Sequence, residues 1–460
     1  MSLIQFATLL VVIGALGWFI HLCRTMFSMN PQHKDIPSGP RGLPTIGHLL
    51  LLGKQPHRSL NELSKKYGPI MSLRLGSVPT IVVSTSAASE LFLKTHDTVF
   101  ASRPKLQAAE YLRYGTKGMI FSEYGTYWRN LRKFCTLELL GSTKIASMAK
   151  MRREELVLLI ESLKIAAKNC VVVYVSQKMA LLMEDMTCRM LFGKSRDERF
   201  DLNAIIHELT IIVGAFNIAG FIPFLGALDP QGLTRRLKET NRAVDEVLET
   251  ISDEHEQDAR DGYTSQIAIT WIMSELLRHP RVMKKLQKEV QNVVGDCEFV
   301  EESHILKLDY LDMIVKESMR LHPVATLLPP HESMKDIVVN GYHIKKKSRI
   351  IANNWGIGRD PRNWSENVDK FLPERFIGSN VDYMGNNFQL IPIGPGQRSC
   401  PGIHLGTIMV NLVVTQLVHT FDWELPFGMS PDELDMEELF GATVPRATHL
   451  LAAPTLRSLP

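Results

Sequence analysis

The sequence has few cysteines, no marked excess of one charge and no low-complexity tract or internal repeat. Its six cysteines lie far apart without a Cys-x-x-Cys pair, which argues against a structural zinc site and a disulfide framework and favours a reducing compartment. Fifty-two basic residues balance 49 acidic ones, so the net charge of +3 does not indicate nucleic-acid binding. No glycine-, serine- or proline-rich linker divides the body of the chain, and we therefore expect one large domain.

The chain has enough apolar sequence for a sizeable core, since 45% of its 460 residues are hydrophobic and 22% are charged. Alternating β-branched residues predict two short strands within residues 71–84, around a Gly-Ser-Val-Pro turn. Most other segments have helical periodicity, and residues 237–251 are typical of an amphipathic surface helix. These patterns predict a fold that is mainly α with a minor β part.

The N-terminal region predicts a membrane anchor. Residues 3–22 carry no charge, and 20 helical residues span about 30 Å of hydrocarbon. The chain starts Met-Ser, its first basic residue is Arg24, and no small-x-small exit follows, which favours a retained anchor over a cleaved signal peptide. A buried core helix is the alternative, but such a helix would need polar positions on one face, and this run is apolar on all faces. The positive flank predicts a single-pass protein of the endoplasmic reticulum with its body in the cytosol.

Three prolines within residues 35–44 stiffen the chain between anchor and body. We therefore expect a signal-anchor at residues 1–24, a proline-rich hinge at residues 25–45 and one domain at residues 46–460. An uncharged stretch at residues 216–228 is too short to span a bilayer. Core packing and a loop that dips into the membrane surface both fit it.

The chemistry is predicted near the C-terminus. Residues 391–402 read Ile-Pro-Ile-Gly-Pro-Gly-Gln-Arg-Ser-Cys-Pro-Gly and precede an apolar helical run at residues 403–417. Glycines let the backbone pass close to a flat ligand, and the free amides of a helix start stabilise a thiolate. A lone loop cysteine is usually an inert buried thiol, but Gly-x-Gly-x-Arg-x-Cys-Pro-Gly reverses that expectation. A thiolate at Cys400 suits a haem iron.

At this loop the chain resembles the cytochrome P-450 family of haem-thiolate monooxygenases, and further motifs follow the family's order. Glu317 and Arg320 match the family's Glu-x-x-Arg, a spacing that by itself indicates only an ordinary helix-surface ion pair. Arg375 lies in Phe-Leu-Pro-Glu-Arg-Phe, which matches Pro-Glu-Arg-Phe. The resemblance implies that these three residues form a buried structural network behind the haem.

A second group of motif residues is implied to bind the haem. Trp128 and Arg132 match Trp-x-x-x-Arg and, one helical turn apart, are expected to bind a propionate, with Arg398 as a second cation. Arg103, in Phe-Ala-Ser-Arg-Pro, also lies at a family motif, with a less defined role. Cys400 is the expected iron ligand, whose thiolate favours O–O cleavage in this family.

The resemblance covers the whole chain and is closest to the plant microsomal branch. It implies a cytochrome P-450 fold behind one transmembrane helix, haem b as cofactor, NADPH electrons through NADPH-cytochrome P-450 reductase, and oxidation of a small lipophilic specialised metabolite. The substrate pocket is expected to draw on four segments, which are residues 106–120, 206–224, 324–330 and 442–445.

The chain also departs from the family. Ile393 stands where phenylalanine is usual, and Gln397 stands where a second arginine is common. These changes are expected to shift the redox poise of the iron more than its ligation by the cysteine. The larger departure concerns the central helix, which in the family carries Ala/Gly-Gly-x-Asp/Glu-Thr-Thr/Ser for proton delivery to oxygen. Residues 263–277 match only its second half, with Tyr263 in the place of the acid and Thr264 as the expected catalytic alcohol.

The missing first half points to an excision. The preceding residues 254–262 are polar and read as the end of a surface helix. By comparison with the family, roughly fifty residues are absent, far more than half a helix contains. This is typical of a spliced or mispredicted transcript.

Four functions remain open from the sequence. They are an NADPH-driven haem monooxygenase, a haem-binding remnant of the same fold with little turnover, a membrane-tethered haem or ligand carrier, and a haem-thiolate isomerase or dehydratase that needs no reductase. A fold alone does not name a substrate. Reductase-dependent product formation would separate the first function from the others.

Overall fold

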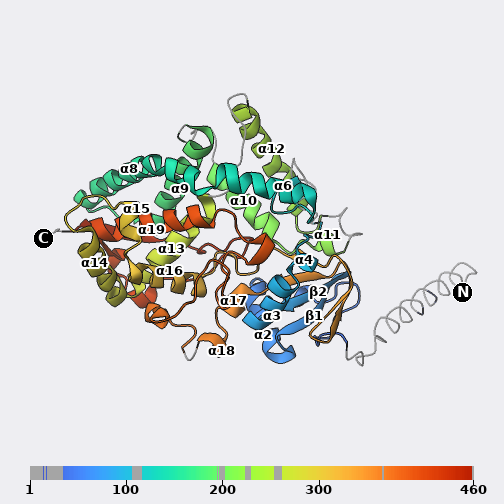
Figure 1. Cartoon of the computed structure of the whole chain (residues 1–460). Helices are drawn as coiled ribbons and strands as arrows, with labels where there is room; N and C mark the ends of the chain where they lie inside the picture. Colours follow the sequence, from blue (N-terminus) through green and yellow to red (C-terminus); the bar gives the residue numbers. More distant parts are fainter. Residues whose placement is uncertain are drawn as a thin grey trace, which may run out of the picture.

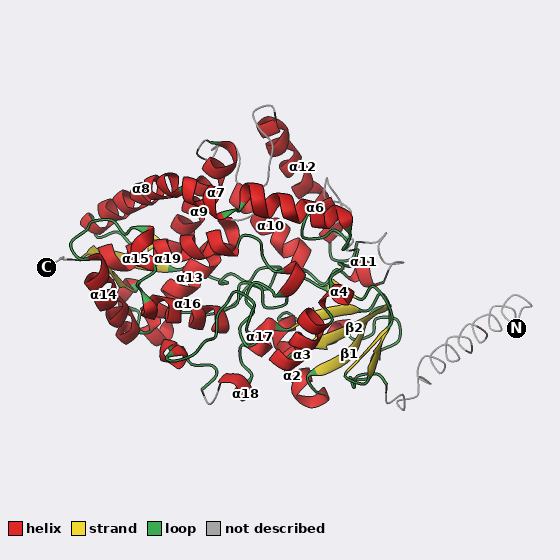
Figure 2. Ribbon diagram, viewed as in Figure 1, coloured by secondary structure: helices red, strands yellow, loops and turns green. Residues whose placement is uncertain are grey.

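The computed structural model describes residues 35–105, 117–193, 195, 202–222, 229–252, 262–364 and 367–457, with two isolated glycines further upstream. Helices make up most of this part, and the small sheets lie toward its edges (Figure 1; Figure 2). The prediction of a mainly α fold with a minor β part is confirmed. The predicted anchor, apart from two isolated glycines, and residues 25–34 of the predicted hinge lie outside the described residues.

The main sheet has four strands in the order β1-β2-β7-β4. β1 and β2 are antiparallel, and Leu75 pairs with Val78 across a two-residue turn in which Gly76 has a φ of 57°. The two strands predicted within residues 71–84 are thereby confirmed. β7 runs parallel to β2, and β4 antiparallel to β7. The strands are β1 (Ile70–Leu75), β2 (Val78–Val83), β3 (Val173–Tyr174), β4 (His331–Glu332), β5 (Ile337–Val339), β6 (Tyr342–Ile344), β7 (Arg349–Ala352), β8 (Phe421–Glu424) and β9 (Leu451–Leu456).

Short helices accompany the main sheet and long helices form the rest of the described fold (Figure 1). The helices are α2 (Pro56–Tyr67), α3 (Ser86–Glu90), α4 (Asp97–Phe100), α6 (Thr126–Phe134), α7 (Ser142–Ser147), α8 (Ala149–Lys168), α9 (Val175–Phe192), α10 (Leu202–Gly214), α11 (Ile218–Phe221), α12 (Leu233–Ser252), α13 (Gly262–Arg278), α14 (Pro280–Val294), α15 (Glu302–Ile305), α16 (Asp309–Leu321), α17 (Asn354–Ile357), α18 (Pro361–Trp364) and α19 (Ile403–Thr420). Single turns of 3₁₀ or π type are η1 (Leu49–Leu51), η2 (Leu91–Thr95), η4 (Cys135–Leu139), η6 (Pro373–Phe376), η7 (Gly396–Arg398), η8 (Pro426–Gly428) and η9 (Pro431–Glu433).

Helix α13 lies at the centre of the helical part and packs against α9, α14, α16 and α19 (Figure 1). Ile269, Ile272 and Leu276 are fully buried, because neighbouring helices cover α13 on several sides. Helix α19 is the one described helix long and apolar enough to cross a membrane, yet 72% of it is buried inside the fold. It is therefore a core helix.

The structure describes parts of the predicted amphipathic helix at residues 237–251 and of the uncharged stretch at residues 216–228. Helix α12 is amphipathic as predicted, with Leu237 buried against α10. In the uncharged stretch, Phe221 and Ile222 are buried in a cluster with side chains of β1 and β2. Core packing is therefore correct for residues 216–222, and residues 223–228 lie outside the described residues.

A buried carboxylate ties α13 to the end of α16. Glu275 is 2% exposed and lies 2.6 Å from Nε2 of His322 and 3.2 Å from Nδ1 of His279. The His322 ring stacks on Trp271 at 4.1 Å between centroids. Burial by itself raises the pKa of Glu275, but the hydrogen bonds and charges of the two histidines outweigh it and lower the pKa to about 2.

We predict that this carboxylate makes the fold acid-sensitive. Because its folded-state pKa lies below the ordinary value of 4.5, Glu275 contributes stability that is present above pH 4.5 and is lost as the pH falls toward 2. The contribution is on the order of 3 kcal/mol. Urea unfolding of Glu275→Gln should therefore show a flatter loss of free energy between pH 5 and pH 3. The exposed Glu62→Gln variant should follow the original protein, and parallel curves for all three would refute the assignment.

Candidate functional site

Cys400 lies between η7 and α19, in the loop predicted from the sequence. It is half-buried, and its N–H donates to the carbonyl of Ile393 at 3.1 Å, so the loop closes on itself. Gly394 and Gly396 have φ values of 74° and 68°, which lie in the left-handed region that favours glycine. The backbone therefore forms the predicted glycine-rich loop, which places one cysteine just before the start of a helix.

The start of α13 lies beside the helix that follows Cys400. A Cβ atom added to Gly406 of α19 would stand 3.6 Å from the hydroxyl of Ser265. Thr264 is exposed and lies in the first turn of α13, which begins at Gly262. The expected catalytic alcohol thus lies in the first turn of α13 that the structure describes, and residues 253–261 before it lie outside the described residues. The side chain of Tyr263 lies outside the described part of the structure.

Two of the predicted cations flank Trp128. Arg398 donates to the carbonyls of Ala101 at 2.7 Å and Ser122 at 2.6 Å, and its guanidinium lies 4.1 Å from the centroid of the Trp128 ring. Arg132 approaches the same ring at 5.7 Å and donates to the carbonyl of Ser399, next to Cys400, at 2.7 Å. The indole N–H of the buried Trp128 already donates to the carbonyl of Met119 at 3.0 Å.

Arg103 forms a third cation of the same group. It is 6% exposed, and its Nη1 donates to the carbonyls of Pro329 and, at 3.0 Å, Pro330. Its Nε has no hydrogen-bond partner among the residues that the structure describes. The next residue along that segment, His331, is buried, and its Nδ1 lies 2.8 Å from the carbonyl of Phe100. Burial and the charge of Arg103 lower the pKa of His331 well below its usual value, which keeps the ring neutral.

The three guanidiniums have no ion-pair partner, since no carboxylate of the described residues lies within 4.0 Å of Arg103, Arg132 or Arg398. Burial and the neighbouring Arg398 lower the pKa of Arg103 to about 9. Burial and the neighbouring Arg132 lower the pKa of Arg398 to about 10. Like charges of this kind, one of them buried and two half-buried, favour an anionic ligand. A flat ligand with two carboxylates, such as haem, fits this donor set beside a cysteine loop.

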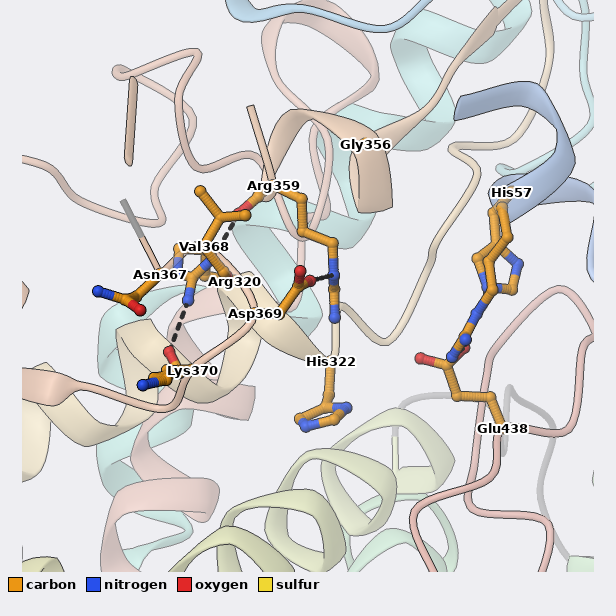
Figure 3. Close-up of polar contacts among 12 residues, drawn as sticks. His57, Arg320, His322, Gly356, Arg359, Asn367, Val368, Asp369, Lys370 and Glu438 are labelled. Atoms are coloured by element: carbon orange, nitrogen blue, oxygen red, sulfur yellow. Dashed lines mark hydrogen bonds and ion pairs between the residues drawn. The ribbon is translucent and has the colours of Figure 1, made fainter. Parts of the chain in front are cut away.

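The structure brings the three predicted network residues together. Glu317 and Arg320 on α16 are buried, and two hydrogen bonds of 2.8 Å join them. Nε of Arg375, from η6, lies 3.2 Å from the same carboxylate. Figure 3 shows Arg320 directed at the main chain of Val368 and Lys370, whose carbonyls it reaches at 2.6 Å and 3.2 Å. Removal of one partner from such a pair costs about 3–5 kcal/mol, so the network is a structural element.

Sequence reasoning missed His331 and Ser399. Ser399 accepts from Arg132 through both its carbonyl and its hydroxyl, the latter at 3.1 Å, but a serine before the cysteine carries no pattern of its own. His331 follows two prolines, which indicate only an extended segment. Both residues contact partners more than 200 positions away, so no local periodicity could have marked them.

Comparison with known proteins agrees with this geometry. The sequence profile of the cytochrome P450 family matches residues 37–266 and 262–451. The chain is 52% identical to cytochrome P450 CYP736A12 of Panax ginseng, with 99% of each chain covered. It is 38% identical to desmethyl-deoxy-podophyllotoxin synthase of Sinopodophyllum hexandrum, with 93% of each covered, and 34% identical to premnaspirodiene oxygenase of Hyoscyamus muticus, with 95% and 96% covered.

The chain therefore belongs to the cytochrome P450 family of haem-thiolate monooxygenases. Within that family it is similar to plant enzymes over nearly its whole length.

The comparisons also bear on the shortened central helix. The alignment with the ginseng protein extends over 499 positions, which exceeds the 460 residues of this chain by 39. At least that many positions of the relative have no counterpart here. The family profile matches in two pieces that meet at residues 262–266, where the sequence predicts the missing half of the helix.

We predict that Cys400→Ala abolishes the thiolate-type absorption of the ferrous carbonyl complex. The physical reason is that Cys400 is the cysteine presented by a left-handed glycine loop at the start of a long helix. The matched control is Cys135→Ala, which removes a buried thiol of η4 and should leave the absorption in place. Persistence of the thiolate signature in Cys400→Ala would show that another residue holds the iron.

Proposed function

We propose that this chain is a membrane-anchored monooxygenase that oxidises a small lipophilic specialised metabolite with O2 and electrons from NADPH-cytochrome P450 reductase. The observation that carries the proposal is the group of three guanidiniums beside the cysteine loop, for which the described residues offer carbonyl acceptors but no carboxylate within 4.0 Å. Plant relatives with oxygenase and synthase names support the class of reaction. The proposed location is the endoplasmic reticulum membrane, with a single N-terminal anchor and the catalytic domain in the cytosol.

Each motif residue has a proposed role. Cys400 is the sole protein ligand of the haem b iron, and the bound haem supplies the activation of dioxygen. Arg132 and Arg398 bind the propionates, because each retains N–H groups beyond those that donate to carbonyls. Trp128 acts through its ring, which packs between these two guanidiniums, since its N–H is already used. Glu317, Arg320 and Arg375 form the structural network.

Three of the proposed substrate segments are supported by contacts near α13. An apolar cluster joins α10, α13, the segment after α16 and the C-terminal segment. Main-chain hydrogen bonds connect Val444 with Val324 at 2.8 Å and Ala442 with Thr210 at 2.9 Å. Apolar side chains of this kind are typical of sites for lipophilic substrates. Residues 106–116 and 223–224 of the expected segments lie outside the described residues. The cluster consists of Ile206, Ile267, Trp271, Val324 and Met436.

The second candidate is a haem-binding remnant with little turnover, and the start of α13 at Gly262 favours it. Ordered proton delivery to oxygen needs a positioned acid and alcohol. In this chain Tyr263 replaces the acid, and Thr264 is exposed in the first helical turn. The carrier and the reductase-independent isomerase or dehydratase are further alternatives, and both require that no product depends on the reductase.

We predict that the chain turns over slowly with its reductase and releases peroxide. A weak acid and a poorly held alcohol deliver protons out of order, and water access favours loss of reduced oxygen. Product per NADPH should be lower by about tenfold or more than in a version that carries the family's full central helix. The measurement is NADPH, peroxide and product in parallel for both versions.

Three outcomes of this assay distinguish the functions. Product that requires the reductase supports the monooxygenase, and haem binding without product in either version supports the carrier. Product without the reductase supports the isomerase or dehydratase. Equal product per NADPH in the two versions would contradict the proposed handicap of the shortened helix.

A further inference from the structure

The three residues before Cys400 are each held by the segment from α4 to α6. The contacts of Arg398 and Ser399 are described above, and both run through arginine side chains. The third contact is different, because the main-chain N–H of Gln397 donates to Oδ2 of Asp97 at 2.8 Å. The two residues are 300 positions apart in the sequence. The turn η7 is therefore fixed by a carboxylate that no family motif above includes.

The loop packs closely against the segment that carries Asp97, and Gly396 leaves no space for a side chain there. A Cβ atom added to Gly396 would stand 2.6 Å from Oδ2 of Asp97 and 2.6 Å from the carbonyl of Leu93. The φ of 68° at Gly396 also lies in the left-handed region. The backbone of the loop thus lies directly on the end of η2 and the start of α4.

The chemistry of this contact suits a positioning role. A hydrogen bond from a main-chain N–H to a carboxylate is charge-assisted and about twice as strong as a neutral one. In the described residues, no lysine or arginine lies within 4.0 Å of Asp97, so its carboxylate is not committed to an ion pair. Arg132 and Arg398 serve the propionates in the proposed function, whereas Asp97 accepts a hydrogen bond from the loop's main chain.

We propose that Asp97 is a positioning residue that holds the turn before Cys400 and keeps its thiolate directed at the haem iron. The proposal rests on the proposed function, because it takes Cys400 as the iron ligand. Asp97 acts through the loop and does not touch the haem.

The test compares three variants of the haem-loaded full chain. Asp97→Ala removes the acceptor, and Asp97→Asn keeps a neutral acceptor of the same shape. Glu90→Ala is the matched control, since it removes a nearby carboxylate that pairs with Lys94 at 2.6 Å. The readout is the rate at which the thiolate-type carbonyl spectrum converts to the non-thiolate type in dilute urea. Asp97→Ala should convert roughly tenfold faster than the original chain, Asp97→Asn roughly threefold faster because a neutral acceptor keeps about half of the bond's strength, and Glu90→Ala within about twofold of the original.

Each outcome decides the question. A rate for Asp97→Ala equal to that of Glu90→Ala overturns the inference and leaves the proposed function intact. Absence of a thiolate spectrum in the original chain overturns the proposed function and the inference with it. If Asp97→Ala does not fold, hydrogen exchange in the original haem-loaded chain decides. A protected Gln397 amide supports the contact, and exchange as fast as in an exposed loop overturns it.

Discussion

Arg103, Arg132 and Arg398 lie close to the cysteine loop without a carboxylate in the described residues, and this unbalanced charge constrains the site. Taking a charge out of water costs several kcal/mol per ion even after relaxation. Backbone carbonyls offset part of that cost, since they accept from all three side chains. They do not remove the mutual repulsion that, after burial, lowers the pKa of Arg103 and of Arg398. An anionic ligand would remove this repulsion. In the proposed function that ligand is haem, and the cysteine loop determines where its flat ring lies.

The proposed function assigns haem binding and oxygen chemistry to different parts of the chain. The elements proposed to hold the haem, namely α6, the loop before Cys400 and α19, all lie within the described residues. The proposed proton delivery depends on α13, which is described from Gly262. Because the core contacts of α13 start with residues such as Ile267 and Ile269, the fold keeps its centre although the helix is short. We therefore expect the shortened helix to lower the rate of substrate turnover more than it weakens haem binding.

Local sequence patterns predicted what is local in the structure. Alternation predicted β1 and β2, and an apolar run predicted α19, because both depend on neighbours a few residues away. The spacing of Glu317 and Arg320 places them on one helix face, but it does not distinguish a surface pair from a buried one. Their burial and their contact with Arg375 followed from the family resemblance and are visible in the structure.

Long-range contacts escaped prediction for a physical reason. The bond from Gln397 to Asp97 joins residues that only the tertiary fold brings together, and neither residue type is unusual in a loop. The family motif suggested that Trp128 and Arg132 bind a propionate, and the structure directs the indole N–H of Trp128 to the carbonyl of Met119. Motifs therefore indicated which side chains gather around the site and left their individual partners open.

The central claim is that the guanidinium group requires the carboxylates of the haem. The most direct measurement is the thermal midpoint of the haem-free full chain after addition of haem or of haem dimethyl ester, which has the same ring and iron but no free propionates. The account predicts a large rise in the midpoint with haem and a much smaller rise with the ester, because only haem carries carboxylates that pair with the guanidiniums. Equal rises with both compounds would contradict it.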